Sequence, residues 1–128
     1  MARQKEVPNP SDSELAILHV LWRKGPLSVR AIWDEMGRKS GYTTVLKFLQ
    51  IMLEKKLVRR DASRHSHVYE AAVEKERTQE RLVSGLIDRA FSGSSSQLVL
   101  RALAAKPVSE EELKTILALL GEEGRKQP

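Results

Sequence analysis

The chain has 128 residues, of which 41% are hydrophobic, 30% charged and only 5% aromatic, a composition typical of a small soluble globular protein rich in helix. It has no cysteine, no apolar run of the roughly 18 residues that span a bilayer and no apolar stretch in residues 1–10, so we expect a cytoplasmic protein without disulfides, thiolate metal sites or direct membrane binding. The formal net charge is +5, and the excess lies in residues 1–73, where 13 Lys and Arg stand against 8 Asp and Glu.

Two helices are predicted near the start of the chain, each delimited by residues that favour helix ends. Residues 11–14 have the S-x-x-E spacing of a capping box, and Gly25-Pro26 is a stop signal, which together predict a helix over 12–24. Ser28 is a suitable N-cap for a short helix over 29–36, whose apolar residues recur at helical spacing. Both helices should therefore bury one apolar side.

A third helix and two strands follow. The helix is predicted from about Thr43 to Lys56, again with one apolar side. Alternating residues predict strands over 57–60 and 67–71, joined by polar residues, so that a β-hairpin follows the helix. Three helices and a hairpin are the order of a winged helix-turn-helix, in which the third helix lies in the DNA major groove. We predict a mainly α fold with a small β-hairpin.

Short polar and basic side chains are spaced along the expected outer side of the third helix. Such side chains can reach base edges and phosphates, and a helix N-terminus attracts phosphate. The tip of the hairpin, or wing, should meet the DNA backbone. The predicted DNA-binding residues are Lys39, Ser40, Tyr42, Thr43, Thr44, Lys47, Gln50, Arg64, His65 and His67.

The charge distribution supports a nucleic-acid partner. Residues 38–64 hold 8 Lys and Arg against 2 acidic residues, whereas residues 74–128 hold 9 against 9. Two alternatives remain open: a winged module that binds an acidic protein, and an architectural DNA binder without sequence preference. Residues on the third helix that can contact bases argue against the second alternative.

The last part of the chain predicts helices over 74–91, 96–105 and 109–121, all with extensive apolar sides. A small domain that left these sides in water would expose a large apolar patch, unless the helices fold back on their own domain. A two-fold pair of chains would bury them and match a palindromic operator. The predicted dimerisation residues are Leu82, Leu86, Phe91, Leu98, Leu103, Leu113, Ile116, Leu117 and Leu120.

The expected organisation is a flexible N-terminus (1–10), a winged helix-turn-helix domain (11–73), a helical dimerisation arm (74–121) and a flexible tail (122–128). There is no Gly-rich phosphate loop, G-x-S-x-G or H-E-x-x-H motif, so no enzyme is expected. His65 and His67 would give a metal only two of the about four ligands of a closed site, so no metal or other cofactor is expected either.

Several of these residues resemble a known family. Residues 13–18 (Ser-Glu-Leu-Ala-Ile-Leu) with Leu21-Trp22, and residues 41–46 (Gly-Tyr-Thr-Thr-Val-Leu) leading into 49–56, resemble the penicillinase-repressor (BlaI/MecI-type) family. The hairpin from residue 57 to Tyr69 stands where that family has its wing. The resemblance covers about residues 11–120.

The resemblance implies a homodimeric repressor that binds palindromic operators of β-lactam resistance or cell-wall stress genes. It also implies that Tyr42, Thr43, Thr44 and Lys47 belong to the DNA-reading surface. Members of the family are released by a cut at an Asn-Phe pair, under a membrane sensor–protease system, and the matching positions here are Arg101 and Ala102. This departure argues against release by the same cut. A second branch senses copper through C-terminal cysteines, which this chain lacks.

Overall fold

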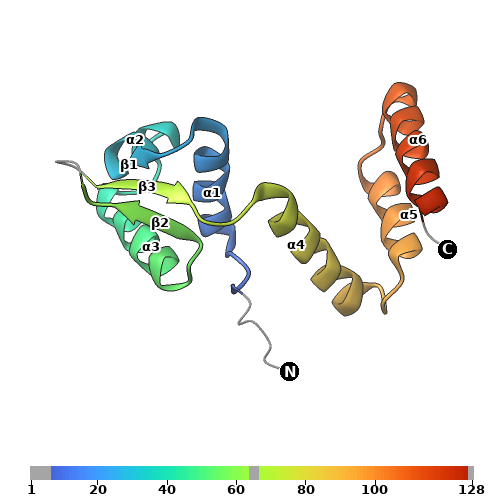
Figure 1. The fold of residues 1–128 in the computed structure, drawn as a ribbon, viewed down its shortest axis with the longest axis horizontal. Helices are drawn as coiled ribbons and strands as arrows, with labels where there is room; N and C mark the ends of the chain where they lie inside the picture. Colours follow the sequence, from blue (N-terminus) through green and yellow to red (C-terminus); the bar gives the residue numbers. More distant parts are fainter. Residues whose placement is uncertain (1–6, 64–66, 127–128) are drawn as a thin grey trace. The chain divides into compact units, whose positions relative to one another are not determined.

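A computed structural model of the chain describes residues 7–63 and 67–126. Within this part, helices predominate and the strands form one small antiparallel sheet, which confirms the predicted fold class (Figure 1). The chain divides into two compact units, the first ending at Val83 and the second beginning at Ser84. The elements are α1 (Asp12–Lys24), β1 (Leu27–Ser28), α2 (Val29–Glu35), α3 (Tyr42–Glu54), β2 (Val58–Asp61), β3 (Val68–Ala71), α4 (Lys75–Ala90), α5 (Ser95–Ala105) and α6 (Glu110–Lys126).

The first three helices begin and end within two residues of their predicted bounds. The capping box that opens α1 is present, because the Ser11 hydroxyl accepts a hydrogen bond from the Glu14 backbone N–H and the Glu14 carboxylate accepts one from that of Ser11. Ser28 caps α2 through the Ala31 N–H. α3 stops before Lys56, whose φ of 64° is incompatible with a further helical turn.

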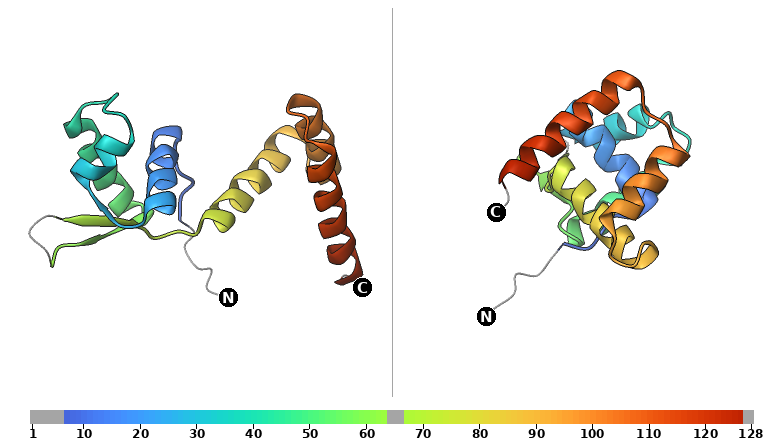
Figure 2. Two further views of the ribbon diagram at one scale, coloured as in Figure 1. Left: turned by 90° about the horizontal axis from the view of Figure 1, so that it is seen from above. Right: turned by 90° about the vertical axis from the view of Figure 1, so that its right-hand side faces the viewer.

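The sheet has three strands in the order β1-β3-β2, one more than the predicted hairpin. β2 and β3 form the hairpin, with Arg60 opposite Tyr69, and they extend from the helices as a wing (Figure 2, left). Leu27 and Ser28 form the additional strand β1 beside β3. The sequence does not reveal β1, because two residues between a proline and a helix cap are too few for an alternating pattern.

The core of the first unit lies where α1, α2 and α3 meet the sheet. Its buried side chains come from every one of these three helices and from both wing strands or their ends. They are Ile17, Leu18, Leu21, Val29, Ile32, Val45, Leu49, Met52, Leu57, Val58 and Tyr69. Trp22 and Trp33 are partly buried against this core, and the Trp22 indole N–H donates to the Val73 carbonyl (2.9 Å). The unit therefore has a complete apolar interior of its own.

An ion pair ties the start of α1 to the end of α3. Glu14 is only 2% exposed, and the Lys55 ammonium lies 2.9 and 3.0 Å from its two carboxylate oxygens. Burial raises the pKa of Glu14, but hydrogen bonds from the Ser11 backbone and from Lys55, with the Lys55 charge, outweigh burial and lower the pKa below its ordinary value. The ionised pair therefore fixes the position of α3 against α1.

The second unit contains the end of α4, together with α5 and α6. Gly93, with φ of 82°, closes α4 by donating to the Ile87 carbonyl (3.0 Å). Ser94 caps α5, and a capping box between Ser109 and Glu112 opens α6. The described side chains of this unit, residues 84–122, are half-buried or exposed, and none is buried.

Two boundaries in the structure lie at other residues than the expected ones. α6 continues to Lys126, so that residues 122–126 are helical where the sequence predicts a flexible tail from 122. A glycine inside a helix costs only about 1 kcal/mol, and the residues Glu-Glu that follow Gly121 favour helix, so the helix can continue past it. The unit boundary lies inside α4, ten residues after the expected end of the winged domain at 73.

The residues before α1 also contact the fold. The sequence predicts a flexible N-terminus over 1–10, of which residues 1–6 lie outside the described part of the chain. Val7 is half-buried against the core, and its carbonyl accepts a hydrogen bond from Arg81 of α4. None of the described helices is long and apolar enough to cross a membrane.

Candidate nucleic-acid interface

α3 separates its side chains into a buried and an exposed face. Val45, Leu49 and Met52 are at most 1% exposed and belong to the core. On the other side, four residues of the predicted outward stripe are exposed, namely Thr43, Thr44, Lys47 and Gln50. Three neutral polar side chains and one cation are thus presented over two turns, a set that can bond both base edges and phosphates.

The turn that leads into α3 is fixed by Trp33. Gly37 and Arg38 have φ of 76° and 54°, which turns the chain sharply after α2. The Trp33 indole N–H donates to the Ser40 carbonyl (2.6 Å), and the Arg38 guanidinium lies 4.3 Å from the centre of the Trp33 ring. Arg38 also pairs with Asp34 at 2.6 Å. The predicted contact residues Lys39 and Ser40 are therefore exposed on a well-fixed turn.

Tyr42, the first residue of α3, is at the centre of an aromatic and cationic group. The residue is 39% exposed, and its ring meets the Trp33 ring edge-on, with 5.8 Å between centroids. The Arg30 guanidinium lies 5.8 Å from the Tyr42 ring centre. Arg30 and Arg38 are absent from the predicted set. The signal for Arg30 in the sequence is its place on the polar side of the 29–36 helix.

The wing contributes exposed basic side chains as well. His67, which the sequence predicts to contact DNA, is exposed directly before β3, whereas Arg64 and His65 lie outside the described residues. Arg59 on β2 pairs with Glu70 across the hairpin at 3.1 Å. Over residues 7–63 and 67–126, no three His, Cys, Asp or Glu side chains are grouped so that they could hold a metal ion.

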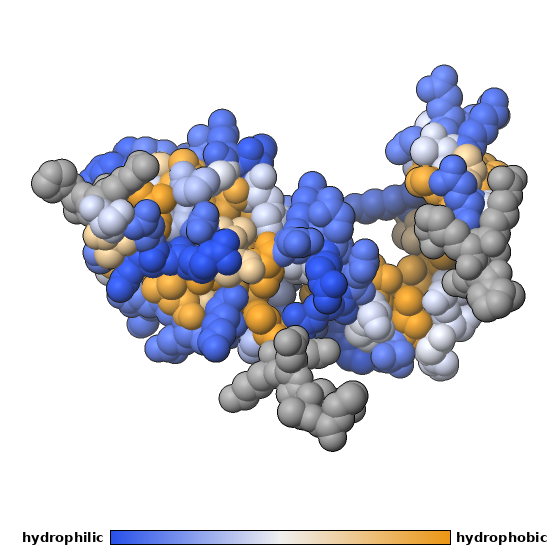
Figure 3. All heavy atoms as spheres, in the orientation of Figure 1, coloured by the Kyte–Doolittle hydropathy of each residue, from blue (hydrophilic) through white to orange (hydrophobic). Residues whose placement is uncertain are grey.

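The predicted dimerisation residues lie on α4, α5 and α6, except for Phe91, which directly follows α4. Hydrophobic side chains reach the surface around α5 and α6 (Figure 3). Leu117 and Leu120 are each 58% exposed, and Leu86 and Leu113 are 41% and 38% exposed. The remaining predicted residues are half-buried, namely Leu82, Phe91, Leu98, Leu103 and Ile116. Arg101 and Ala102, where the family resemblance locates a cut, are exposed on α5.

Comparison with known proteins identifies the family. The sequence matches the penicillinase repressor family over residues 10–122. The chain belongs to the penicillinase repressor family. The penicillinase repressor of Bacillus licheniformis is 24% identical over 123 residues, which cover 92% of this chain and 94% of that protein. Membership confirms a DNA-binding transcriptional regulator of the repressor type, a class that is not enzymatic.

Solved structures of other transcriptional regulators are also similar to this penicillinase repressor family member. The PcaV regulator of Streptomyces coelicolor, solved with its natural ligand, has a TM-score of 0.48 at 15% identity, covering 92% of this chain and 77% of that one. A MarR family regulator from Silicibacter pomeroyi has a TM-score of 0.43 at 20% identity, covering 98% and 74%. With scores this low, the fold description rests on the helices and strands of the chain itself.

Proposed function

We propose that the chain is a homodimeric, sequence-specific repressor that reads a palindromic operator with α3 and the wing. The observation that supports this most is the exposed stripe of α3, where Thr43, Thr44, Lys47 and Gln50 are all available while the opposite side is buried. Polar side chains that can bond base edges are the means of sequence reading in the major groove. The fixed turn at Trp33 presents the start of the helix without a further ordering cost.

The exposed apolar face of α6 in the second unit is the basis on which we propose a homodimer. Its α6 presents Leu113, Leu117 and Leu120 at spacings of four and three residues, which is one face of a helix, and all three are exposed. Soluble proteins rarely leave such a face in water, and a second copy of the chain offers the same face in return. A two-fold pair holds two α3 helices in opposite directions, which is the symmetry of a palindrome. We therefore assign the arm, residues 74–121, to dimerisation.

The regulated genes are proposed from the relative. Because the Bacillus licheniformis protein is named a penicillinase repressor, we propose that this chain controls genes of β-lactam resistance or cell-wall stress. If a membrane sensor–protease releases this repressor, α5 should be cut between Arg101 and Ala102, both of which are exposed. Mass spectrometry of the chain from cells treated with a β-lactam would reveal the two fragments.

A binding selection on random duplex DNA tests the proposed function. We expect an enriched palindrome with half-sites about one helical turn apart, bound in a salt-dependent manner. Salt-dependent binding without any enriched sequence would make the chain an architectural DNA binder. No binding even at low salt would favour the alternative of a winged module with an acidic protein partner.

A further inference from the structure

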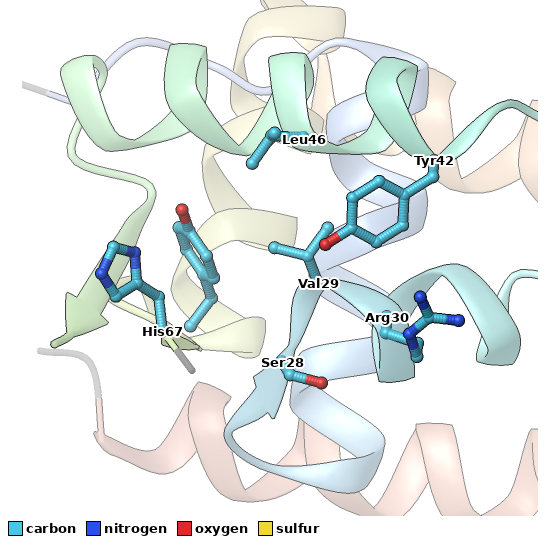
Figure 4. Close-up of a pocket in the computed structure, with 7 residues that line it drawn as sticks. Ser28, Val29, Arg30, Tyr42, Leu46 and His67 are labelled. Carbon is cyan, nitrogen blue, oxygen red and sulfur yellow. The ribbon is translucent and has the colours of Figure 1, made fainter. Parts of the chain in front are cut away.

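A hollow of about 510 Å³ lies between the starts of α2 and α3 and the strand β3 of the wing (Figure 4). Val29, Leu46 and Tyr69 provide apolar surface at its base. Arg30 and His67 stand on opposite sides of it, and the Tyr42 hydroxyl points into it (Figure 4). The hollow therefore combines an apolar floor with a cationic and hydrogen-bonding rim.

The positive charge at this rim is not neutralised by an acidic side chain, in contrast to several other arginines of the first unit. Among the described residues, Arg23, Arg38 and Arg59 each have an acidic partner within 3.5 Å. Arg30 has no such ion pair within the described part of the chain, and no carboxylate lines the hollow there. Arg30 lies instead over the Tyr42 ring, 5.8 Å from its centre, which orients the guanidinium without neutralising it.

The position of the hollow indicates what could occupy it. The hollow separates the start of α3 from the wing, so it lies between the two elements of the proposed DNA interface. If α3 enters the major groove and the wing reaches outside that groove, the sugar–phosphate backbone at the groove edge must pass between them. A guanidinium and a phenol hydroxyl are suitable donors to a phosphate, and an apolar floor suits the carbon face of a deoxyribose.

We propose that this hollow seats one sugar–phosphate unit of the operator backbone, with Arg30 as the phosphate ligand and Tyr42 as the residue that orients Arg30. The proposal rests on the proposed DNA-binding function and adds to it a contact that carries no sequence information. Arg30 therefore contributes to affinity on any duplex, whereas the stripe on α3 contributes to the choice of sequence.

The test compares the salt dependence of binding for Arg30→Gln and for the wild type. Both are measured on the enriched operator and on a scrambled duplex of equal length. We expect Arg30→Gln to weaken binding to both duplexes by the same factor and to reduce the slope of log K against log salt by about 0.9 for each phosphate that the variant no longer neutralises. Arg30→Lys should retain the wild-type slope, because it keeps the charge, while binding more weakly than wild type.

The matched control is Arg77→Gln, which removes the same charge from an exposed position on α4. It should leave the slope unchanged, and equal thermal unfolding of all variants should show that none is misfolded. If the slope of log K against log salt is unchanged in Arg30→Gln while the wild type binds DNA, the proposed phosphate contact is wrong and the proposed function is unaffected. A loss confined to the operator shows that Arg30 reads a base and also overturns it. Failure of the wild type to bind either duplex overturns the proposed function and the seat together.

A second arm distinguishes the DNA phosphate from a small organic anion. Benzoate is titrated against an equal concentration of chloride in the absence of DNA, and tryptophan fluorescence is followed because Trp33 touches Tyr42. We expect no saturable change. Saturable binding that is abolished in Arg30→Gln would assign the hollow to a small organic acid and overturn the backbone seat.

Discussion

The two units of this chain use helices of similar amphipathic pattern but reach very different degrees of burial. In the first unit, eleven side chains from three helices and the sheet form a buried cluster. In the second unit, none of the described side chains from residue 84 to 122 is buried, and Leu117, Leu119 and Leu120 are more than half exposed. An apolar helix face indicates that the face is covered by other apolar side chains. Whether these come from the same unit depends on how many helices and sheets pack together in that unit.

This difference indicates a division of work between the units. The first unit is complete as a single chain and presents a fixed polar surface, as a DNA-reading domain requires. The second unit leaves large apolar side chains exposed, and in our proposal a second copy of the chain covers them. Substitutions that disrupt the second unit should therefore have different consequences from substitutions that disrupt the first.

Leu117→Glu should have the largest effect, conversion of the dimer to monomers with weak operator binding. In the proposed dimer, the substitution places an unpaired carboxylate from each chain in an apolar interface, which is highly unfavourable. Sedimentation of the purified variant measures it. Thr115→Glu is the control, since Thr115 lies two residues away, off the Leu113–Leu117–Leu120 face. Unchanged sedimentation of Leu117→Glu would refute the dimer arm.

Leu49→Ala should destabilise the first unit by about 2–5 kcal/mol, because it leaves a cavity where a fully buried side chain meets the core. The free energy of unfolding by urea measures the loss, which should not depend on protein concentration. Ile51→Ala on the same helix is the control, because Ile51 is 38% exposed and its truncation should cost much less. Equal losses for the two variants would mean that the first unit is not independently packed.

Glu14→Gln should destabilise the first unit by about 3 kcal/mol, since it removes one charge of a largely buried ion pair and leaves Lys55 without its partner. The pKa of Glu14 is lowered in the folded chain, so its stabilising effect is complete above the pKa of an unfolded glutamate and is lost as the pH falls through the folded pKa. The difference in unfolding free energy between wild type and variant should therefore shrink below about pH 4. A constant difference at all pH values would contradict this.

Lys47→Ala should have the smallest effect, a loss of about 1–3 kcal/mol in operator binding with unchanged stability, if Lys47 contacts a base. The motivation is its exposed place on the α3 stripe. Fluorescence anisotropy on the operator and on a random duplex measures both losses. A loss of equal size on the random duplex would make Lys47 a phosphate contact and remove it from the sequence-reading set.

Local features of this fold could be predicted from the sequence, and contacts between distant residues could not. The ends of α1 followed from Ser11, Glu14 and Gly25, because caps act within a few residues. The pairing of Glu14 with Lys55 spans 41 residues and leaves no local pattern. The strand β1 has too few residues to show an alternating pattern in the sequence. The continuation of α6 beyond Gly121 has no local signal, because a glycine is compatible with either the end or the interior of a helix.

The same distinction applies to the candidate interface. The exposed stripe on α3 followed from helical spacing, because the buried side of an amphipathic helix defines the opposite one. The Arg30–Tyr42 contact joins two elements across a turn, and its geometry depends on the left-handed residues Gly37 and Arg38. Periodicity within one helix cannot supply such a contact.

The most direct test of the proposed dimeric repressor is the mass of its complex with a duplex that carries one enriched palindrome, measured by light scattering over a protein titration. We predict two chains on each duplex and no complex with one chain at substoichiometric protein, because the second unit joins the chains before they bind. A stable complex with a single chain, bound to one half-site, would contradict the dimer.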